Sequence, residues 1–160
     1  MTDESAGHGN AVTPHLVVSD TEAALRFYAE AYGAEELFRL TMPDGAIVHA
    51  EMLIGGALVM LADASPEHGN RAPDTAGEPP SVLMNLLVPD VDDVVARAKA
   101  AGAEELIPVD DRFYGHRSGR IRDPFGHVWI VATIIENVSP QEMQRRMDAM
   151  TDEAQAETGS

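Results

Sequence analysis

The residues in this sequence with the clearest chemical potential are two histidines and a glutamate in the first half of the chain. His49 and Glu51 stand two positions apart in a stretch that alternates polar and apolar residues, and His15 lies in an earlier run rich in β-branched residues. Alternate side chains of a strand project from the same face, so we expect His49 and Glu51 to be neighbours. With Glu51 as general base and a histidine as its partner, such a site could move a proton next to a carbonyl group, as an isomerase, lyase or cyclase does. The same side chains could also hold a metal ion, although their spacing matches no known ligand pattern.

A second group of candidates lies in the segment 113–119, which reads FYGHRSG and is predicted to be a loop. Tyr114 could stack on a ligand there. Arg117 could bind an anion, but in so acidic a chain we expect it to pair with surface carboxylates instead. Arg122 and Asp123 come shortly afterwards and are expected to stabilise the turn that follows them.

The charge balance and the missing cysteines exclude several classes of protein. Of 160 residues, 27 are acidic and 11 are basic, which leaves a net charge of −16. So much negative charge argues against binding to nucleic acid or to an anionic membrane, and it favours the attraction of cationic ligands. No cysteine is present, which excludes thiolate catalysis and cysteine-ligated metals. The N-terminal stretch is polar and no long apolar run occurs, so we expect a soluble, cytoplasmic protein.

The elements that would position the candidate residues occur twice. The sequence GAEEL appears at 33–37 and again at 102–106, and Asp20 and Asp90 precede the two copies by 13 and 12 residues. An internal duplication explains both matches, and each copy reads as a β-α-β-β-β module. The predicted helices span 21–32 and 91–101, and the predicted strands span 12–18, 37–40, 47–53, 57–61, 82–88, 106–109, 119–122 and 127–133.

These elements predict a single α+β domain. A proline- and glycine-rich linker separates the modules, and a Ser-Pro-Gln-Glu capping box starts an added C-terminal helix. The expected boundaries are module one at 12–63, the linker at 64–80, module two at 81–136, the C-terminal helix at 139–150, and disordered tails at 1–11 and 151–160.

A two-residue hairpin loop at Gly55 and Gly56 sets the register of the strands on either side. Glu51 is then opposite Met60, and opposite residues of an antiparallel pair share a face of the sheet. His49 shares that face by alternation. The hairpin alone therefore predicts that His49, Glu51 and Met60 lie together.

Several stretches of the sequence resemble the vicinal-oxygen-chelate superfamily, which includes glyoxalase I, extradiol dioxygenases, fosfomycin-resistance enzymes and bleomycin-resistance proteins. These stretches are TPHLVVSD…FY, HAE…IGGALVMLAD, FYGHRSGRIRDPFGHVW and the trailing VSPQEM, and they look most like the PhnB-like branch. The resemblance implies two modules whose sheets curve together into a cup, usually completed in a homodimer. It specifies the fold better than the activity, because the superfamily hosts several chemistries.

In the metal-dependent members, the resemblance implies four His or Glu ligands inside the cup. Carried over to this sequence, the four positions hold Thr13, Met60, Leu83 or Met84, and Ile130. The third position is ambiguous because the second helix is one residue shorter. None of these side chains suits a divalent ion, so we expect no metal and no other cofactor. Glyoxalase, dioxygenase and fosfomycin-type activities are therefore disfavoured.

The side chains expected to line the cup combine apolar groups with one acid. They are His15, His49, Glu51, Met60, Met84 and Ile130, with Tyr114 on a loop above them. The apolar members could instead be ordinary core, and His49 and Glu51 could form an exposed pair or a contact at a dimer seam. Trp129 alternates with Ile130 and is expected to face the helices.

Two functions of different classes follow from this lining. The leading hypothesis is a metal-free homodimer that sequesters a small cationic or aromatic molecule, as the bleomycin-resistance proteins that it resembles do, in a role in antibiotic resistance. The alternative is a metal-free isomerase, lyase or cyclase with Glu51 as general base. A third reading is a cup that serves only as a dimer or partner surface.

Overall fold

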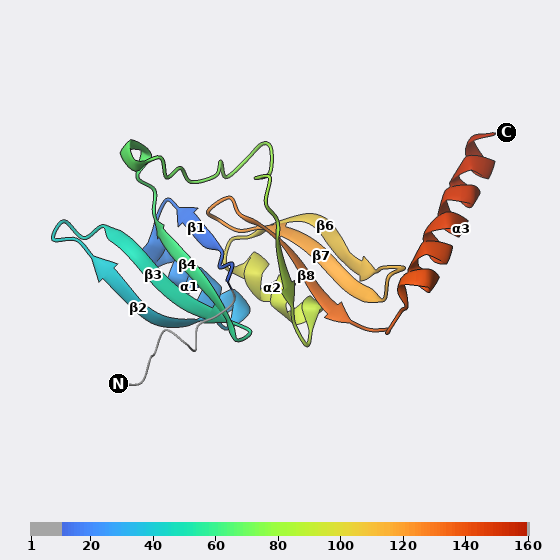
Figure 1. The fold of residues 1–160 in the computed structure, drawn as a ribbon, viewed down its shortest axis with the longest axis horizontal. Helices are drawn as coiled ribbons and strands as arrows, with labels where there is room; N and C mark the ends of the chain where they lie inside the picture. Colours follow the sequence, from blue (N-terminus) through green and yellow to red (C-terminus); the bar gives the residue numbers. More distant parts are fainter. Residues whose placement is uncertain (1–10, 160) are drawn as a thin grey trace.

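The computed structural model describes residues 11–159 and shows a β-α-β-β-β module that occurs twice, followed by a C-terminal helix (Figure 1). The elements of module one are β1 (His15–Val18), α1 (Thr21–Tyr32), β2 (Glu35–Thr41), β3 (Ile47–Ile54) and β4 (Ala57–Asp63). After a linker that contains the short 3-10 helix η2 (Pro66–His68), module two contains β5 (Met84–Leu87), α2 (Val91–Ala100), β6 (Glu104–Asp111), β7 (His116–Arg122) and β8 (Val128–Ile134). The C-terminal helix is α3 (Pro140–Thr158). The expected α+β fold with tandem modules is confirmed.

Each module builds its own four-stranded mixed sheet. The strand order is β1-β4-β3-β2 in the first sheet and β5-β8-β7-β6 in the second. The pairs β1–β4 and β5–β8 are parallel, and all other pairs are antiparallel. Among the described residues no strand pairing joins the two sheets. One chain therefore presents two separate sheets rather than one continuous sheet.

The two module helices start as the sequence predicts. Asp20 caps α1 by accepting a hydrogen bond from the Ala23 amide, and Asp90 caps α2 by accepting one from the Asp93 amide. α1 ends at Gly33, whose φ of 69° lies in the left-handed region that favours glycine. Both helices bury their apolar sides, so one face of each sheet is covered by its own helix.

A shared hydrophobic core joins the modules. α1 and α2 pack against each other, and buried side chains of both sheets belong to one cluster. In this core Asp123 accepts hydrogen bonds from the Tyr28 hydroxyl at 2.5 Å and from Trp129 Nε1 at 2.9 Å. Burial and the adjacent Asp123 carboxylate raise the pKa of Tyr28, so its hydroxyl remains a donor. Trp129 is buried on the helix side of its sheet, as predicted, and the open faces of both sheets are left for function.

Asp123 also stabilises the turn between β7 and β8, as the sequence predicts. Its Oδ1 accepts hydrogen bonds from the amides of Phe125 at 2.9 Å and His127 at 3.0 Å. The neighbouring Arg122 instead holds the linker, by donating to the backbone carbonyl oxygens of Thr75 at 3.4 Å and Gly77 at 2.8 Å. The linker is therefore bound to the end of module two rather than free of it.

Three boundaries differ from the sequence predictions. Residues 151–158 continue α3 rather than forming a disordered tail, because the two alanines, two glutamates and one glutamine of that segment favour a helix. Residues His116–Arg122 form β7, so most of the predicted loop 113–119 is strand. β1 begins at His15 rather than at residue 12. The predicted tail at 1–11 falls outside the described residues except for residue 11.

α3 extends from the end of module two, away from both sheets (Figure 1). Arg146 anchors its first turns by donating to the Phe113 carbonyl oxygen at 2.8 Å and by pairing with Glu136. None of its residues is buried. Neither α3 nor any other helix in the described part of the chain is long and apolar enough to cross a membrane.

Candidate functional site

The open face of module one, here called the module-one face, brings together most of the residues predicted to do chemistry. Glu51 and Met60 are direct partners between β3 and β4, which confirms the register predicted from the glycine hairpin. His15 is the partner of Met60 on the other side, in the parallel pair of β1 and β4. The face consists of His15, Phe38, Leu40, His49, Glu51, Leu53, Leu58 and Met60.

The polar side chains of this face are in direct contact. His49 Nε2 lies 3.1 Å from Glu51 Oε1, and both side chains are half-buried. The rings of His15 and His49 meet edge to face, with centroids 5.9 Å apart. Burial, together with the nearby His49, lowers the pKa of His15 below its usual 6.5, so this ring is neutral at pH 7. The group can accept a proton at Glu51 or bind a cationic or hydrogen-bond-donating group there.

The open face of module two, the module-two face, carries a different set of side chains. Ile130 is the cross-strand partner of Arg120 on β7 and of Asn85 on β5. Above this strand pair the Tyr114 hydroxyl lies 3.3 Å from Ser118 Oγ. A cavity of about 240 Å³ opens on this face and is lined by Ile107, Arg112, Tyr114, Ser118, Gly119, Arg120 and Ile130. Tyr114 and Ile130, which the sequence places among the ligand contacts, therefore line one cavity, on a different sheet from His49 and Glu51.

The expectation that Met84 faces the cup is wrong. In the parallel pair of β5 and β8, Met84 is opposite Trp129 and Asn85 is opposite Ile130. Met84 therefore lies on the helix side of the sheet, and Asn85 is its neighbour on the open face. Leu83, the other candidate for the third ligand position, precedes β5 and is exposed.

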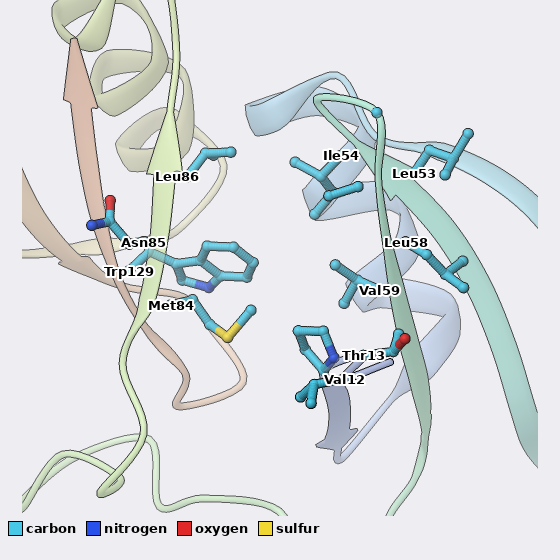
Figure 2. A pocket seen from close by; sticks show the side chains of 13 residues that line it. Val12, Thr13, Leu53, Ile54, Leu58, Val59, Met84, Asn85, Leu86 and Trp129 are labelled. Atoms are coloured by element: carbon cyan, nitrogen blue, oxygen red, sulfur yellow. The ribbon is translucent and has the colours of Figure 1, made fainter. Parts of the chain in front are cut away.

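Met84 instead lines a cavity of about 490 Å³ between the two modules (Figure 2). Figure 2 shows Met84 and Trp129 on one side of this cavity, facing Ile54 and Val59 of module one. Its lining is mostly apolar and contains no ionisable side chain. The cavity has space for an apolar group, but no ionisable side chain in its lining could act as an acid or a base.

The side chains at the metal positions implied by the resemblance do not fit a divalent ion. Met60 offers only a thioether, Ile130 offers no donor atom, and Thr13 offers a neutral hydroxyl. Over residues 11–159, no three His, Asp or Glu side chains gather closely enough to hold a metal, and this includes the group of His15, His49 and Glu51.

Arg117 does not contact the module-two cavity. Its Nε donates to Asp92 Oδ2 at 2.8 Å and its Nη1 donates to Asp111 Oδ1 at 3.0 Å, so it pairs with surface carboxylates as the sequence predicts. Two other arginines of that cavity, Arg112 and Arg120, were not predicted. Counting the strand register outward from the Asp-Pro-Phe-Gly turn, as was done for the Gly55-Gly56 hairpin, places Arg120 opposite Ile130.

Comparisons with known proteins agree with this architecture. Residues 10–131 match the family model described as Glyoxalase/Bleomycin resistance protein/Dioxygenase superfamily. An uncharacterized protein of Mycobacterium bovis is 39% identical over 145 residues, which cover 89% of this chain and 95% of that protein. Among solved structures, TioX from Micromonospora sp. ML1 is 26% identical with a TM-score of 0.58, covering 79% of this chain and 99% of TioX. A PhnB protein from Bacillus cereus, titled a putative 3-demethylubiquinone-9 3-methyltransferase, is 18% identical with a TM-score of 0.62, covering 78% of this chain and 99% of that one. With a family model matched over most of its length and tandem modules of the expected order, this chain belongs to the Glyoxalase/Bleomycin resistance protein/Dioxygenase superfamily.

Proposed function

We propose that this protein is a cytoplasmic homodimer that binds and sequesters a small organic molecule without a metal ion. The observation that carries the proposal is the composition of the module-one face. The position implied for a metal ligand there is Met60, whereas the neighbouring His49 contacts both Glu51 and the ring of His15. Such a face lacks ligands for a divalent ion but offers polar groups to an organic ligand.

The homodimer is supported by the apolar side chains that each open face exposes. Phe38 and Leu40 are 45% and 54% exposed on the module-one face, and Leu87 and Ile134 are 54% and 59% exposed on the open side of module two. Exposed apolar surface of this kind is typical of interaction sites. A second copy that brings its module-two face over the module-one face would cover both sets and enclose a cup between them.

For the ligand, we propose a cationic or aromatic molecule. Glu51 and His49 favour a cationic or hydrogen-bond-donating group, and Phe38 and Tyr114 supply rings for contact with an aromatic body. The net charge of −16 attracts cations over longer distances. Sequestering such a molecule would protect a cell from an antibiotic of that charge.

The test is calorimetry with a panel of cationic aromatic compounds that includes benzamidine. We expect binding to the wild-type protein, about tenfold weaker binding to Glu51→Gln, and unchanged binding to Glu30→Gln, which removes the same charge from the exposed surface of α1. Metal analysis of the purified protein is expected to find less than one divalent ion per chain. The absence of binding to every compound of the panel, or one bound metal ion per chain, would contradict the proposal.

The contact between His49 and Glu51 also favours a second function, a metal-free isomerase, lyase or cyclase. Glu51 would remove a proton next to a carbonyl group, with His49 as its hydrogen-bonding partner. Acetophenone in D₂O is a simple probe, because deuterium uptake at its methyl group reports general-base catalysis. Uptake that is lost in Glu51→Gln while binding is retained supports the enzyme, and uptake no faster than in buffer excludes this activity for the probe's carbonyl class.

A further inference from the structure

Two arginines of the module-two face lack the carboxylate partners that most other cations in this protein have. Arg39, Arg97, Arg117, Arg145 and Arg146 all form ion pairs, as does Lys99. Among the described residues, Arg112 and Arg120 have no acidic partner, although acidic residues outnumber basic ones by 27 to 11. Arg26, Arg71 and Arg122 also have none, but Arg26 and Arg71 are exposed to water and Arg122 donates to two carbonyl oxygens of the linker, whereas Arg112 and Arg120 both line the module-two cavity.

Arg120 shows the strongest sign of a missing acceptor. Its side chain is half-buried between Ile107 and Ile130, its partners on the neighbouring strands. Its Nε is fully buried and makes no hydrogen bond within the described part of the chain. In the described structure the terminal nitrogens of Arg120 make no hydrogen bond either, so the guanidinium that lines the cavity keeps donors for an acceptor that a ligand supplies.

Arg112 is held in position beside it. Its Nη2 donates to the carbonyl oxygens of Pro108 at 2.7 Å and Ser118 at 2.9 Å, and its Nε donates to Ser118 Oγ at 3.4 Å. These bonds orient the guanidinium without neutralising its charge. In the described structure Nη1 of Arg112 makes no hydrogen bond, and it remains available to a ligand.

From these contacts we infer that the module-two face binds an anionic group, and that the ligand carries an organic carboxylate in addition to the cationic or aromatic part that the module-one face binds. A planar carboxylate matches the paired donors of a guanidinium better than any cationic or neutral group does. Ile107, Ile130 and Tyr114 line the rest of the cavity and would contact the body of the ligand. This inference rests on the proposed function and deepens it, since it assigns the end of the molecule that the module-one face does not bind.

The experiment uses three compounds of nearly the same shape and different charge: benzoate, benzamide and benzamidine. Their binding to the full-length protein is measured by calorimetry and by chemical-shift changes at one ionic strength. We expect benzoate to bind at least tenfold more tightly than benzamide. Arg120→Gln should weaken benzoate binding about tenfold, Arg112→Gln should weaken it by a smaller factor, and the exposed control Arg26→Gln should leave it unchanged.

The three compounds separate failure of this inference from failure of the proposed function. If benzamidine binds in a manner sensitive to Glu51→Gln but benzoate binds no better than benzamide, the anion site is wrong and the proposed function stands. If none of the three binds, both are wrong. Equal losses of benzoate affinity in Arg120→Gln and Arg26→Gln would also contradict the proposed site, because the effect would then come from the overall charge of the protein.

Arg120→Lys keeps the positive charge but removes the paired donors of the guanidinium. Because the charge is kept, this variant controls for a loss of folding in Arg120→Gln. It is expected to bind benzoate with an affinity between those of the wild type and Arg120→Gln. An unchanged circular dichroism spectrum and melting temperature in both variants ensures that the comparison reports binding. An Arg120→Lys variant that binds benzoate as tightly as the wild type, with the fold intact, would contradict the role of the paired donors.

Discussion

The two modules of this protein share a backbone plan but have opposite charges on their open faces. Both start their helices with an aspartate cap and order their strands in the same way. Glu51 is the cross-strand partner of Met60 in module one, and Arg120 holds the same place beside Ile130 in module two. Packing against the helices constrains one face of each sheet, whereas the open face is free to change after a duplication.

A second difference concerns the carboxylates that hold each module together. In module one Asp63 accepts hydrogen bonds from the amides of Thr21 and Ile47, both at 2.8 Å. At the matching place in module two the Thr133 hydroxyl accepts a hydrogen bond from the Val91 amide at 2.8 Å. Module two in turn has Asp123, which has no counterpart at the glycine hairpin of module one. Each module is therefore stabilised by one carboxylate, and the two carboxylates lie at different positions of the shared β-α-β-β-β arrangement.

The largest effect is expected from removing the carboxylate of module two. Asp123→Ala leaves Tyr28, Trp129 and two turn amides without an acceptor in a buried site, so we expect the free energy of unfolding to fall by about 3–5 kcal/mol. Urea denaturation at pH 7 measures this. Asp44→Ala, which removes an exposed acid that accepts only the Ala46 amide from the turn of module one, is the control, with a loss within about 1 kcal/mol. Similar losses in both variants would show that the modules are not joined through Asp123.

The next effect concerns the open face itself. Leu40→Asp places a charge on the module-one face and is expected to raise the dimer dissociation constant about 100-fold or more. Val48→Asp is the matched control, because Val48 is 50% exposed, close to the 54% of Leu40, but has no partner on the module-one face, since it lies at a register shift between β2 and β3. Sedimentation velocity at several concentrations measures both. Dimers that resist Leu40→Asp and dissociate with Val48→Asp would place the interface outside the module-one face.

A smaller, pH-dependent effect is expected for the carboxylate of module one. Burial alone would raise the pKa of Asp63, but the hydrogen bonds from Thr21 and Ile47 outweigh it and lower the pKa below its usual 3.8. A lowered pKa in the folded state contributes stability above the unfolded value, and that stability is lost as the pH falls through the folded pKa. Asp63→Asn should therefore cost about 1–2 kcal/mol at pH 7 and progressively less below pH 4. A cost that is independent of pH would contradict the charge-assisted role.

The smallest effect is the titration of His15. Its pKa is lowered first by burial and then by His49, so NMR titration should find the midpoint below 6.5. His49→Gln should raise this midpoint without restoring 6.5, because burial remains. Since the folded state disfavours the charged ring, the contribution of His15 to stability decreases as the pH falls below 6.5. A titration midpoint that does not change in His49→Gln would show that His49 has no influence on the pKa of His15.

The module-one face could be predicted from the sequence because one local feature sets it. Two glycines with left-handed φ, 56° at Gly55 and 80° at Gly56, form the shortest hairpin loop, and the register follows residue by residue. Strand alternation then places His49 beside Glu51. No long-range information is needed for this part of the site.

The module-two face was predicted only in part, because the first half of β7 has a weak strand signal. Residues 116–118 have the composition of a loop, yet they belong to β7. The glycine that follows them is explained by packing, since a Cβ on Gly119 would come within 2.8 Å of Val109 Cγ2. Arg120 lies within the predicted strand 119–122, but the register across the Asp-Pro-Phe-Gly turn was not used to assign it to a face. Met84 was misplaced for a related reason, since a helix shorter by one residue shifts the alignment of β5, and a shift of one residue reverses every side chain.

The Asp123 carboxylate has a further consequence for how binding at one site changes the affinity of another. It joins Tyr28 of module one to Trp129 of module two, and His127 Nε2 adds a second link to the Val17 carbonyl oxygen at 2.8 Å. In the proposed dimer the two modules of one chain belong to different cups. A ligand that displaces one sheet must therefore strain the same chain's contribution to the other cup. If the protein forms this dimer, we expect occupancy of the first site to change the affinity of the second, so that binding isotherms deviate from two independent sites.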